Sequence, residues 1–378
     1  MLDRAQAREL CDGILARFPS RETELILRSV RGSSLRLAES GPSEQNARVD
    51  RELSIRVERD GRTGRARTGS LAPEAVDAAL EAAWAAALVA PHLELPPLAE
   101  RSEDSDGGQD EATVRRIADH DPRQKVAEVS GCLARVRESG AVATGFYSTE
   151  GCSLTHGTSR GSFRHGFLGT SAFSSTVVAE DGAGVAHVIR QGADLDREAI
   201  EEVGERALDR ALASRRPMEI EPGEYRVLLE PRAVGDLLQF LAYAGLGARS
   251  FLDGSSFLTD HLGEQLLSPR ISLRDDPFDP RVLGLGFDLE GQTRKRVELI
   301  SGGVAKSPVY DRPTALEAGM KTTGNGLEQP SAAGPQVTYL VLEAAGETTA
   351  DLLARIDRGL LITQFHYSNL IDPLPVTV

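Results

Sequence analysis

Hydrophobic residues near the N-terminus recur at three- and four-residue spacing, which predicts an amphipathic helix capped by Asp3. The residues that form its apolar face are Ala7, Leu10, Cys11, Ile14, Leu15 and Phe18. The same periodicity predicts further helices over about 74–89, 122–139, 196–212, 233–244 and 351–358. The second of these six helices is so rich in alanine that we expect it to pack closely against a neighbouring element.

Between these helices the hydrophobic pattern changes to alternation, which indicates strands that are buried on one face. Two long stretches alternate in this way, 24–68 and 141–189, and Asp60-Gly61 marks a tight turn within the first. Short strands are predicted near 225–229, 271–273, 297–300, 337–342 and 360–365. Strands and helices do not alternate regularly, so we expect an α+β fold with mixed or antiparallel sheets flanked by helices.

Two segments interrupt the periodic pattern. Residues 91–120 contain prolines and an acidic, glycine-bearing stretch at about 98–112, which predicts a surface loop. Arg215-Arg216-Pro217, followed by Glu221-Pro-Gly-Glu224, is typical of a domain boundary. At 378 residues the chain is long enough for two domains. We therefore predict an N-terminal α+β domain over 1–216 and a C-terminal α+β domain over 217–378.

Composition narrows the functional classes. A net charge of -14 argues against nucleic-acid binding, which needs clustered Lys and Arg. No run approaches the roughly 20 apolar residues of a membrane span, and the N-terminus lacks the apolar core of a signal peptide. We therefore expect a cytoplasmic protein without a membrane partner. Three widely spaced cysteines, an odd number, favour buried thiols over disulfides or a zinc ribbon.

A serine motif offers one route to a hydrolase. Gly157-Thr-Ser159-Arg-Gly161 matches the G-x-S-x-G pattern, and His366 follows it in chain order as a possible base. That motif needs a sharp strand-to-helix turn, whereas here the match lies in continuous strand alternation. A strand or hairpin serine is therefore the better interpretation.

Carboxylates and histidines are the remaining candidates for chemistry. Asp288 and Glu290 lie close in sequence and suit either acid–base work or a turn. His156 and His165 would share a metal only if they project together from neighbouring strands. No pair among the seven histidines has the helical spacing of a zinc site, so we expect no metal in this chain.

Several blocks in the C-terminal half resemble the TldD/PmbA family, first named as modulators of DNA gyrase and related to metallopeptidases. The blocks that carry the resemblance are EPGEYRVLLEP at 221–231, GSSF at 254–257, FDLEG at 287–291, LISGG at 299–303, TGN at 323–325 and GLLIT at 359–363. The N-terminal part agrees more loosely. The resemblance implies a two-domain α+β fold, dimers, and small or unfolded peptides as substrates.

In TldD-type members a helix carries H-E-x-x-x-H, in which two imidazoles bind zinc and the glutamate activates water. The resemblance places that helix on this chain with Gln239, Phe240 and Ala244 in the three functional positions. Gln is a poor zinc ligand, Ala has no donor atom and Phe takes no proton. No histidine lies between His187 and His261, so a small shift in register restores nothing.

The pattern therefore resembles the PmbA or TldE type, which lacks the zinc helix. We expect a non-catalytic subunit, without a cofactor of its own, that pairs with a zinc-bearing TldD-type peptidase. The alternatives are a stand-alone hydrolase that uses Asp288, Glu290, Ser159 or His366, and a homodimeric peptide-binding protein. The resemblance also implies a C-terminal domain shorter than the family pattern.

Overall fold

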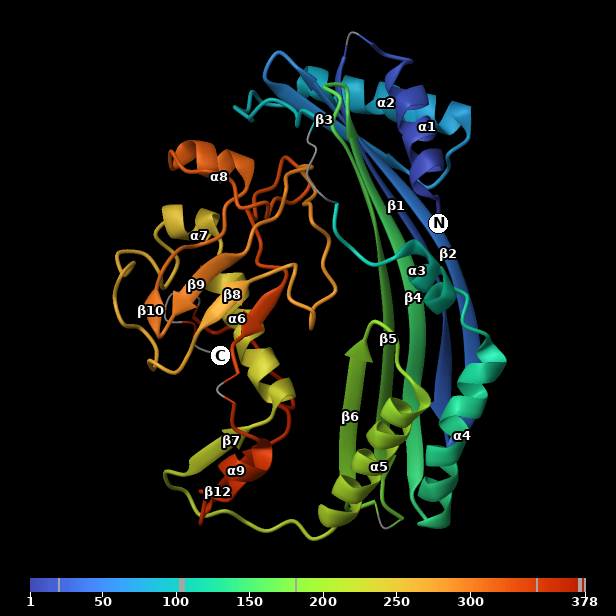
Figure 1. Ribbon diagram of the computed structural model, residues 1–378, viewed down its shortest axis with the longest axis vertical. Helices are drawn as coiled ribbons and strands as arrows, with labels where there is room; N and C mark the ends of the chain where they lie inside the picture. Colours follow the sequence, from blue (N-terminus) through green and yellow to red (C-terminus); the bar gives the residue numbers. More distant parts are fainter. Residues whose placement is uncertain (20, 102–105, 181, 345, 373–375, 377–378) are drawn as a thin grey trace.

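A long, twisted, six-stranded antiparallel sheet forms the N-terminal part of the molecule in the computed structural model, which describes residues 1–19, 21–101, 106–180, 182–344, 346–372 and 376 (Figure 1). Its strand order is β3-β2-β1-β4-β5-β6. The strands are β1 (Glu22–Ala38), β2 (Gly41–Arg59), β3 (Arg62–Thr68), β4 (Val142–Thr158), β5 (Phe163–Val178) and β6 (Val185–Gly192).

Five helices cover one face of this sheet, and the C-terminal part of the chain faces the other (Figure 1). The helices are α1 (Arg4–Leu15), α2 (Pro73–Val89), α3 (Glu111–Ala118), α4 (Pro122–Glu138) and α5 (Arg197–Ala213). Because side chains alternate along a strand, every second residue of the sheet points to the helices and the others point to the C-terminal part.

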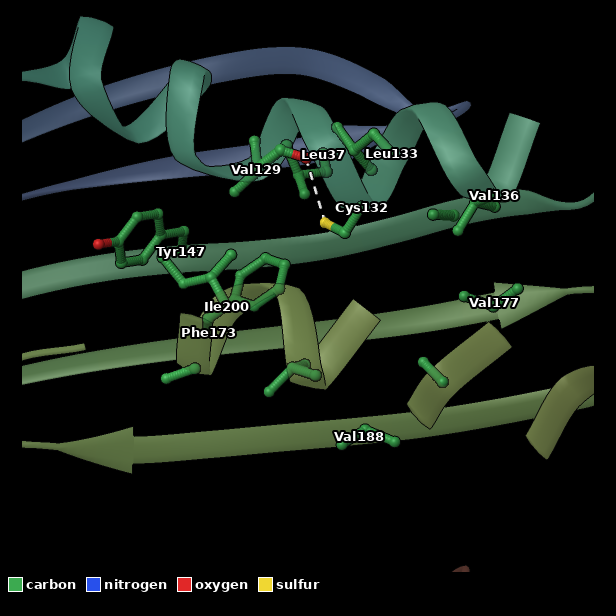
Figure 2. Close-up of a cluster of buried hydrophobic side chains, with 14 of the residues drawn as sticks. Leu37, Val129, Cys132, Leu133, Val136, Tyr147, Phe173, Val177, Val188 and Ile200 are labelled. Carbon is green, nitrogen blue, oxygen red and sulfur yellow. Dashed lines mark hydrogen bonds between the residues drawn. The ribbon is translucent and has the colours of Figure 1, made fainter. Parts of the chain in front are cut away.

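Two buried hydrophobic clusters lie between the sheet and its helices, one towards each end. At one end, α1 and α2 pack on Leu25, Leu27 and Ile55. At the other end, α4 and α5 pack on Leu37, Tyr147, Phe173 and Val177 of the strands (Figure 2). The two clusters hold the helices on the sheet at both ends.

The C-terminal part has its own sheet of four short antiparallel strands, in the order β10-β9-β8-β11, and a parallel pair, β12-β7. Its elements are β7 (Arg226–Leu229), α6 (Pro231–Gly245), α7 (Ala248–Leu252), β8 (Leu273–Asp275), β9 (Val297–Ser301), β10 (Val304–Ala305), α8 (Arg312–Glu317), β11 (Leu340–Leu342), α9 (Thr349–Leu353) and β12 (Gly359–Ile362). A third hydrophobic cluster, separate from the first two, lies under α6 and includes Leu246, Leu273 and Leu299. The two larger sheets are antiparallel and the small pair is parallel, and helices flank them. This arrangement confirms the predicted α+β class.

The strongly periodic elements agree with their sequence prediction. Asp3 caps α1 and Asp196 caps α5, each by accepting a hydrogen bond from a backbone N–H in the first turn. Asp60 and Gly61 turn the chain from β2 into β3 with φ of 50° and 70°, the left-handed conformation that two-residue hairpins require.

The prediction of a surface loop over 91–120 was wrong at the C-terminal end of that segment. Residues 111–118 form α3, which begins within the stretch 98–112 and buries Val114, Ile117 and Ala118 against the sheet. Asp110 caps this helix by accepting a hydrogen bond from the backbone N–H of Thr113. The helix is only eight residues long, so its apolar positions are too few to stand out as a period. Residues 102–105 of the predicted loop lie outside the described part of the chain.

Segment 214–225 connects α5 to β7 without helix or strand, and most of its residues are exposed. This is where the sequence predicts the boundary between 1–216 and 217–378, and the division into two domains stays a prediction. None of the helices in the described ranges combines the length and the apolar character that crossing a bilayer requires.

Candidate functional site

Helix α6 occupies the place that the resemblance gives to the zinc-binding helix. Gln239 is exposed, Phe240 is half-buried and Ala244 is buried. The only acidic residue of the helix, Asp236, pairs with Arg232 at 3.5 Å. An amide, a phenyl ring and a methyl group offer no zinc site and no general base, so the residues on α6 do not fit the metal.

A mainly apolar cavity of about 1280 Å³ runs alongside α6. Leu237, Leu238 and Leu241 of the helix line it, and Phe257 and Ile271 line it from elsewhere in the C-terminal part. Apolar cavities of this size suit small or extended organic ligands. The cavity therefore offers a largely apolar surface to a ligand.

His261 is the one histidine that lines this cavity. Its Nδ1 lies 2.8 Å from Oε2 of Glu264, and both side chains are about half exposed. Within the described ranges, no group of three or more His, Cys, Asp or Glu side chains is arranged to hold a metal ion.

Asp288 and Glu290 lie together in a tight turn, and both are buried, with 1% and 3% exposure. Asp288 accepts hydrogen bonds from the backbone N–H groups of Glu290, Gln292 and Gly326, at 3.0, 2.8 and 2.7 Å. Glu290 accepts one from the N–H of Arg312 at 2.9 Å. From the sequence, Asp288 and Glu290 suit either acid–base chemistry or a turn. The structure shows a turn whose carboxylates hold neighbouring loops in place.

Burial raises the pKa of the Asp288 carboxyl, and burial together with the charge of Asp288 raises the pKa of Glu290 well above its usual value. Two carboxyls this close cannot both ionise without a large cost, so the pair holds a proton more readily than free carboxyls do. Neither side chain lines the apolar cavity beside α6.

A buried ionic cluster, which sequence reasoning missed, lies on the sheet face that points to the C-terminal part. Nε of Arg56 is 2.8 Å from Oε2 of Glu24, and Nε2 of His156 donates to Oε1 of Glu24 at 3.2 Å. Burial by itself raises the pKa of Glu24, but the Arg56 guanidinium and the hydrogen bond with His156 bring it down to about 2. All three side chains are at least 96% buried.

This cluster meets the carboxylate turn directly. Gly291, with φ of 72°, lies so close to His156 that a Cβ there would be 2.4 Å from the imidazole ring. The two arrangements are therefore part of one contact between the sheet and the C-terminal part. The signal in the sequence was a charged residue beside apolar strand residues: Glu24 precedes Leu25, and Arg56 lies between Ile55 and Val57.

The two histidines of the possible shared metal site point to opposite faces. In the β4–β5 register Thr155 pairs with His165 and His156 pairs with Arg164, so His156 and His165 are on opposite sides of the sheet. Nδ1 of His165 is 2.8 Å from the Thr155 hydroxyl. A metal shared by these two histidines is excluded.

Ser159 lies in the turn between β4 and β5, and its hydroxyl accepts a hydrogen bond from the N–H of Thr23 at 3.0 Å. The turn leads into a strand and not into a helix, which confirms the hairpin interpretation. His366 is exposed and follows β12, which lies with β7 at the opposite end of the molecule from the β4–β5 turn (Figure 1). The structure therefore does not bring Ser159 and His366 together as a catalytic pair.

Comparison with known proteins assigns the chain to a family. Residues 23–87 match the PmbA/TldA metallopeptidase domain 1, and residues 222–376 match the PmbA/TldA metallopeptidase C-terminal domain. Together the two matches cover more than half of the chain. Fold and domains thus define a protein of the metallopeptidase-related class. The chain belongs to the PmbA/TldD family.

Similar proteins agree with this assignment. A metalloprotease of Methanothermobacter thermautotrophicus is 29% identical over 154 residues, which are 39% of this chain and 34% of the relative. The match thus spans about a third of that relative's length. TldE of Thermococcus kodakarensis has the same fold, with a TM-score of 0.83 at 24% identity over 96% of this chain and 83% of that one. A putative modulator of DNA gyrase from Thermotoga maritima also has a TM-score of 0.83, at 23% identity over 94% and 82% of the two chains.

Proposed function

We propose that this chain is a non-catalytic, TldE-like subunit that associates in the cytoplasm with a zinc-bearing TldD-type peptidase during proteolysis or peptide maturation. The observation that carries the proposal is the side-chain chemistry of α6, where Gln239, Phe240 and Ala244 replace two zinc ligands and a base. The fold of the family is retained while its hydrolytic groups are missing from this helix.

The cavity beside α6 supports a role in binding. Its walls are formed by leucine, phenylalanine and isoleucine side chains, which favour the apolar side chains of an unfolded peptide. On α6 itself, Tyr243 is 70% exposed and Leu237 is 36% exposed. Both side chains are accessible to a partner that packs along α6.

Reconstitution tests the proposal. The chain would be purified alone and together with a family member from its own cells that carries H-E-x-x-x-H, and each preparation would be assayed for zinc and for cleavage of an unfolded peptide. We expect a stable 1:1 complex, with zinc and cleavage in the complex and neither in the chain alone. Stoichiometric zinc or peptide cleavage in the chain alone would contradict the proposal.

Two variants locate the surface involved. Tyr243→Ala and Leu237→Ala remove exposed apolar contacts of α6, and we expect each to weaken the complex by about tenfold. Leu316→Ala, at an exposed position of α8, is the matched control and is expected to leave the complex unchanged. Self-association of the chain, with no binding to the zinc-bearing member, would favour a homodimeric peptide-binding protein instead.

A further inference from the structure

A second cavity, of about 500 Å³, lies between the two parts of the chain and has a different chemical character. Four basic side chains line it: Arg101, Arg160, Lys295 and Arg312. Among the described residues, Glu100 is the only acidic one that lines it. In a chain with a net charge of -14, this concentration of positive charge needs a physical reason.

The walls of this basic cavity are held by contacts within each part. On one side the Ala99 carbonyl accepts a hydrogen bond from the Thr158 hydroxyl at 2.6 Å, and Glu100 forms a β-bridge with Gly161. On the other side the N–H of Lys295 donates to the Thr323 carbonyl at 3.0 Å. The basic side chains thus project from backbone that is fixed in place.

Two of the four cations are already engaged. Arg160 forms two hydrogen bonds with Glu22, at 2.9 and 3.1 Å, and lies 3.6 Å from Glu100. Lys295 donates from Nζ to the Thr322 carbonyl at 2.8 Å. A carbonyl does not neutralise the ammonium charge, and Nζ keeps two further protons to donate.

The other two cations, Arg101 and Arg312, make no ion pair with the acidic side chains of the described residues. The backbone N–H of Arg312 donates a hydrogen bond to Oε2 of Glu290 at 2.9 Å. Burial and the charge of Asp288 raise the pKa of Glu290, and the charge of Arg312 lowers it in part.

From this arrangement we propose that the basic cavity binds a small oxyanion, a phosphate or carboxylate group, through Lys295 and Arg312 with support from Arg101. A guanidinium forms paired hydrogen bonds with such groups, and an ammonium adds a compact charge. Because the walls come from both parts of the chain, the bound anion links residues 97–101 to residues 291–312. The site is independent of the subunit role proposed above.

The purified full-length chain would be titrated with inorganic phosphate by calorimetry and by thermal unfolding, with chloride keeping the ionic strength constant. A tripeptide with a free α-carboxylate and the same tripeptide as its amide form two further arms. We expect saturable phosphate binding, with Tm rising by about 2 °C at tenfold excess over Kd. If only the peptide acid binds, the oxyanion is a carboxylate.

Lys295→Gln and Arg312→Gln are each expected to weaken binding by about fivefold or more, since each removes a charged donor. Arg270→Gln is the matched control, because Arg270 is exposed and lies outside the cavity. Circular dichroism and Tm without anion establish that the variants fold. The proposal is overturned if neither anion saturates the wild-type chain below about 10 mM, or if both variants bind as the wild type does.

Discussion

At the scale of single residues, the buried carboxyls of 288–291 show how one sequence motif serves the fold. The two carboxylate oxygens of Asp288 accept hydrogen bonds from three backbone N–H groups of two separate loops. Glu290 reaches a third segment through Arg312. A motif that suggests acid–base chemistry in the sequence therefore acts as a junction between loops.

Replacing Asp288 by Ala is expected to lower the free energy of unfolding by about 3 kcal/mol, because three buried N–H groups lose their acceptor. Urea unfolding followed by circular dichroism measures this change. Asp50→Ala is the control: Asp50 is exposed and pairs with Arg48 on the surface, so about 0.5 kcal/mol or less is expected. Equal effects in the two variants would show that the buried junction contributes no special stability.

The raised pKa of Glu290 predicts that the free energy of unfolding depends on pH. Its pKa is raised in the folded chain, so the folded state binds more protons than the unfolded state once the pH exceeds the unfolded value of about 4.5. The contribution of Glu290 is therefore fully present at low pH and is lost as the pH rises towards the raised pKa.

Glu290→Gln, which stays neutral at every pH, is the test of this dependence. The wild type should lose stability relative to the variant as the pH rises from about 5 towards the raised pKa of Glu290, by up to roughly 1.4 kcal/mol per pH unit. Urea unfolding at four pH values measures the difference. Glu94→Gln, at an exposed position, should give a nearly constant difference. The same constancy for Glu290→Gln would contradict the assignment.

At the scale of elements, a close approach between a turn and a strand joins the two parts of the chain. Gly291 combines a left-handed backbone with contact against the His156 ring. His156 is in turn held by Glu24, which Arg56 holds. The turn thus fits against a side chain whose position the sheet has already fixed.

Gly291→Ala is expected to destabilise the chain by about 2–4 kcal/mol, partly from backbone strain and partly from the clash with His156. In the double variant with His156→Ala, the clash is relieved and the strain of about 1 kcal/mol remains. A double-mutant cycle of unfolding free energies measures the coupling, and additive effects would argue against the contact.

Gly235→Ala is the control for this cycle, since Gly235 lies in α6 with open space around its Cα. Alanine is the better helix former, so this variant is expected to be neutral or to gain up to about 1 kcal/mol.

At the scale of the whole molecule, polar contacts hold the C-terminal part against the sheet. Arg65 and Arg67 both pair with Glu328, and Nη1 of Arg164 donates to the Thr293 hydroxyl at 3.0 Å. The covalent connection between the two parts is the exposed segment 214–225. Cleavage of that segment therefore separates the effect of the contacts from the effect of the connection.

Limited trypsin treatment is expected to cut first after Arg215, because the segment is exposed and lacks helix or strand. Mass spectrometry should find fragments 1–215 and 216–378. The fragments should elute together on size exclusion and separate only in denaturant. Arg215→Gln is the control and should remove this cut, since proline follows Arg216. Early cleavage elsewhere, or fragments that part at once, would argue against the predicted boundary.

The local hydrophobic pattern was enough to predict most of the long, regularly patterned helices and strands. The helix that Asp196 caps and the hairpin at Asp60-Gly61 follow from a few adjacent residues, because capping and turn geometry are local interactions. Helix α3 was missed because its burial depends on the sheet beneath it and not on a period visible in eight residues. Predictions thus failed where a distant element supplied the stabilising contact.

The sequence by itself determined the absence of histidine from 188–260, and with it the absence of H-E-x-x-x-H from this stretch, because residue identity needs no fold. It also determined the α+β class through the change from helical to alternating periodicity. Only the tertiary structure decided what the candidate residues do. It placed Ser159 at the opposite end from β12, which His366 follows, turned His156 and His165 to opposite faces, and buried Asp288 and Glu290 among neighbouring loops. These outcomes depend on strand register and on contacts between segments more than a hundred residues apart, which no local pattern encodes.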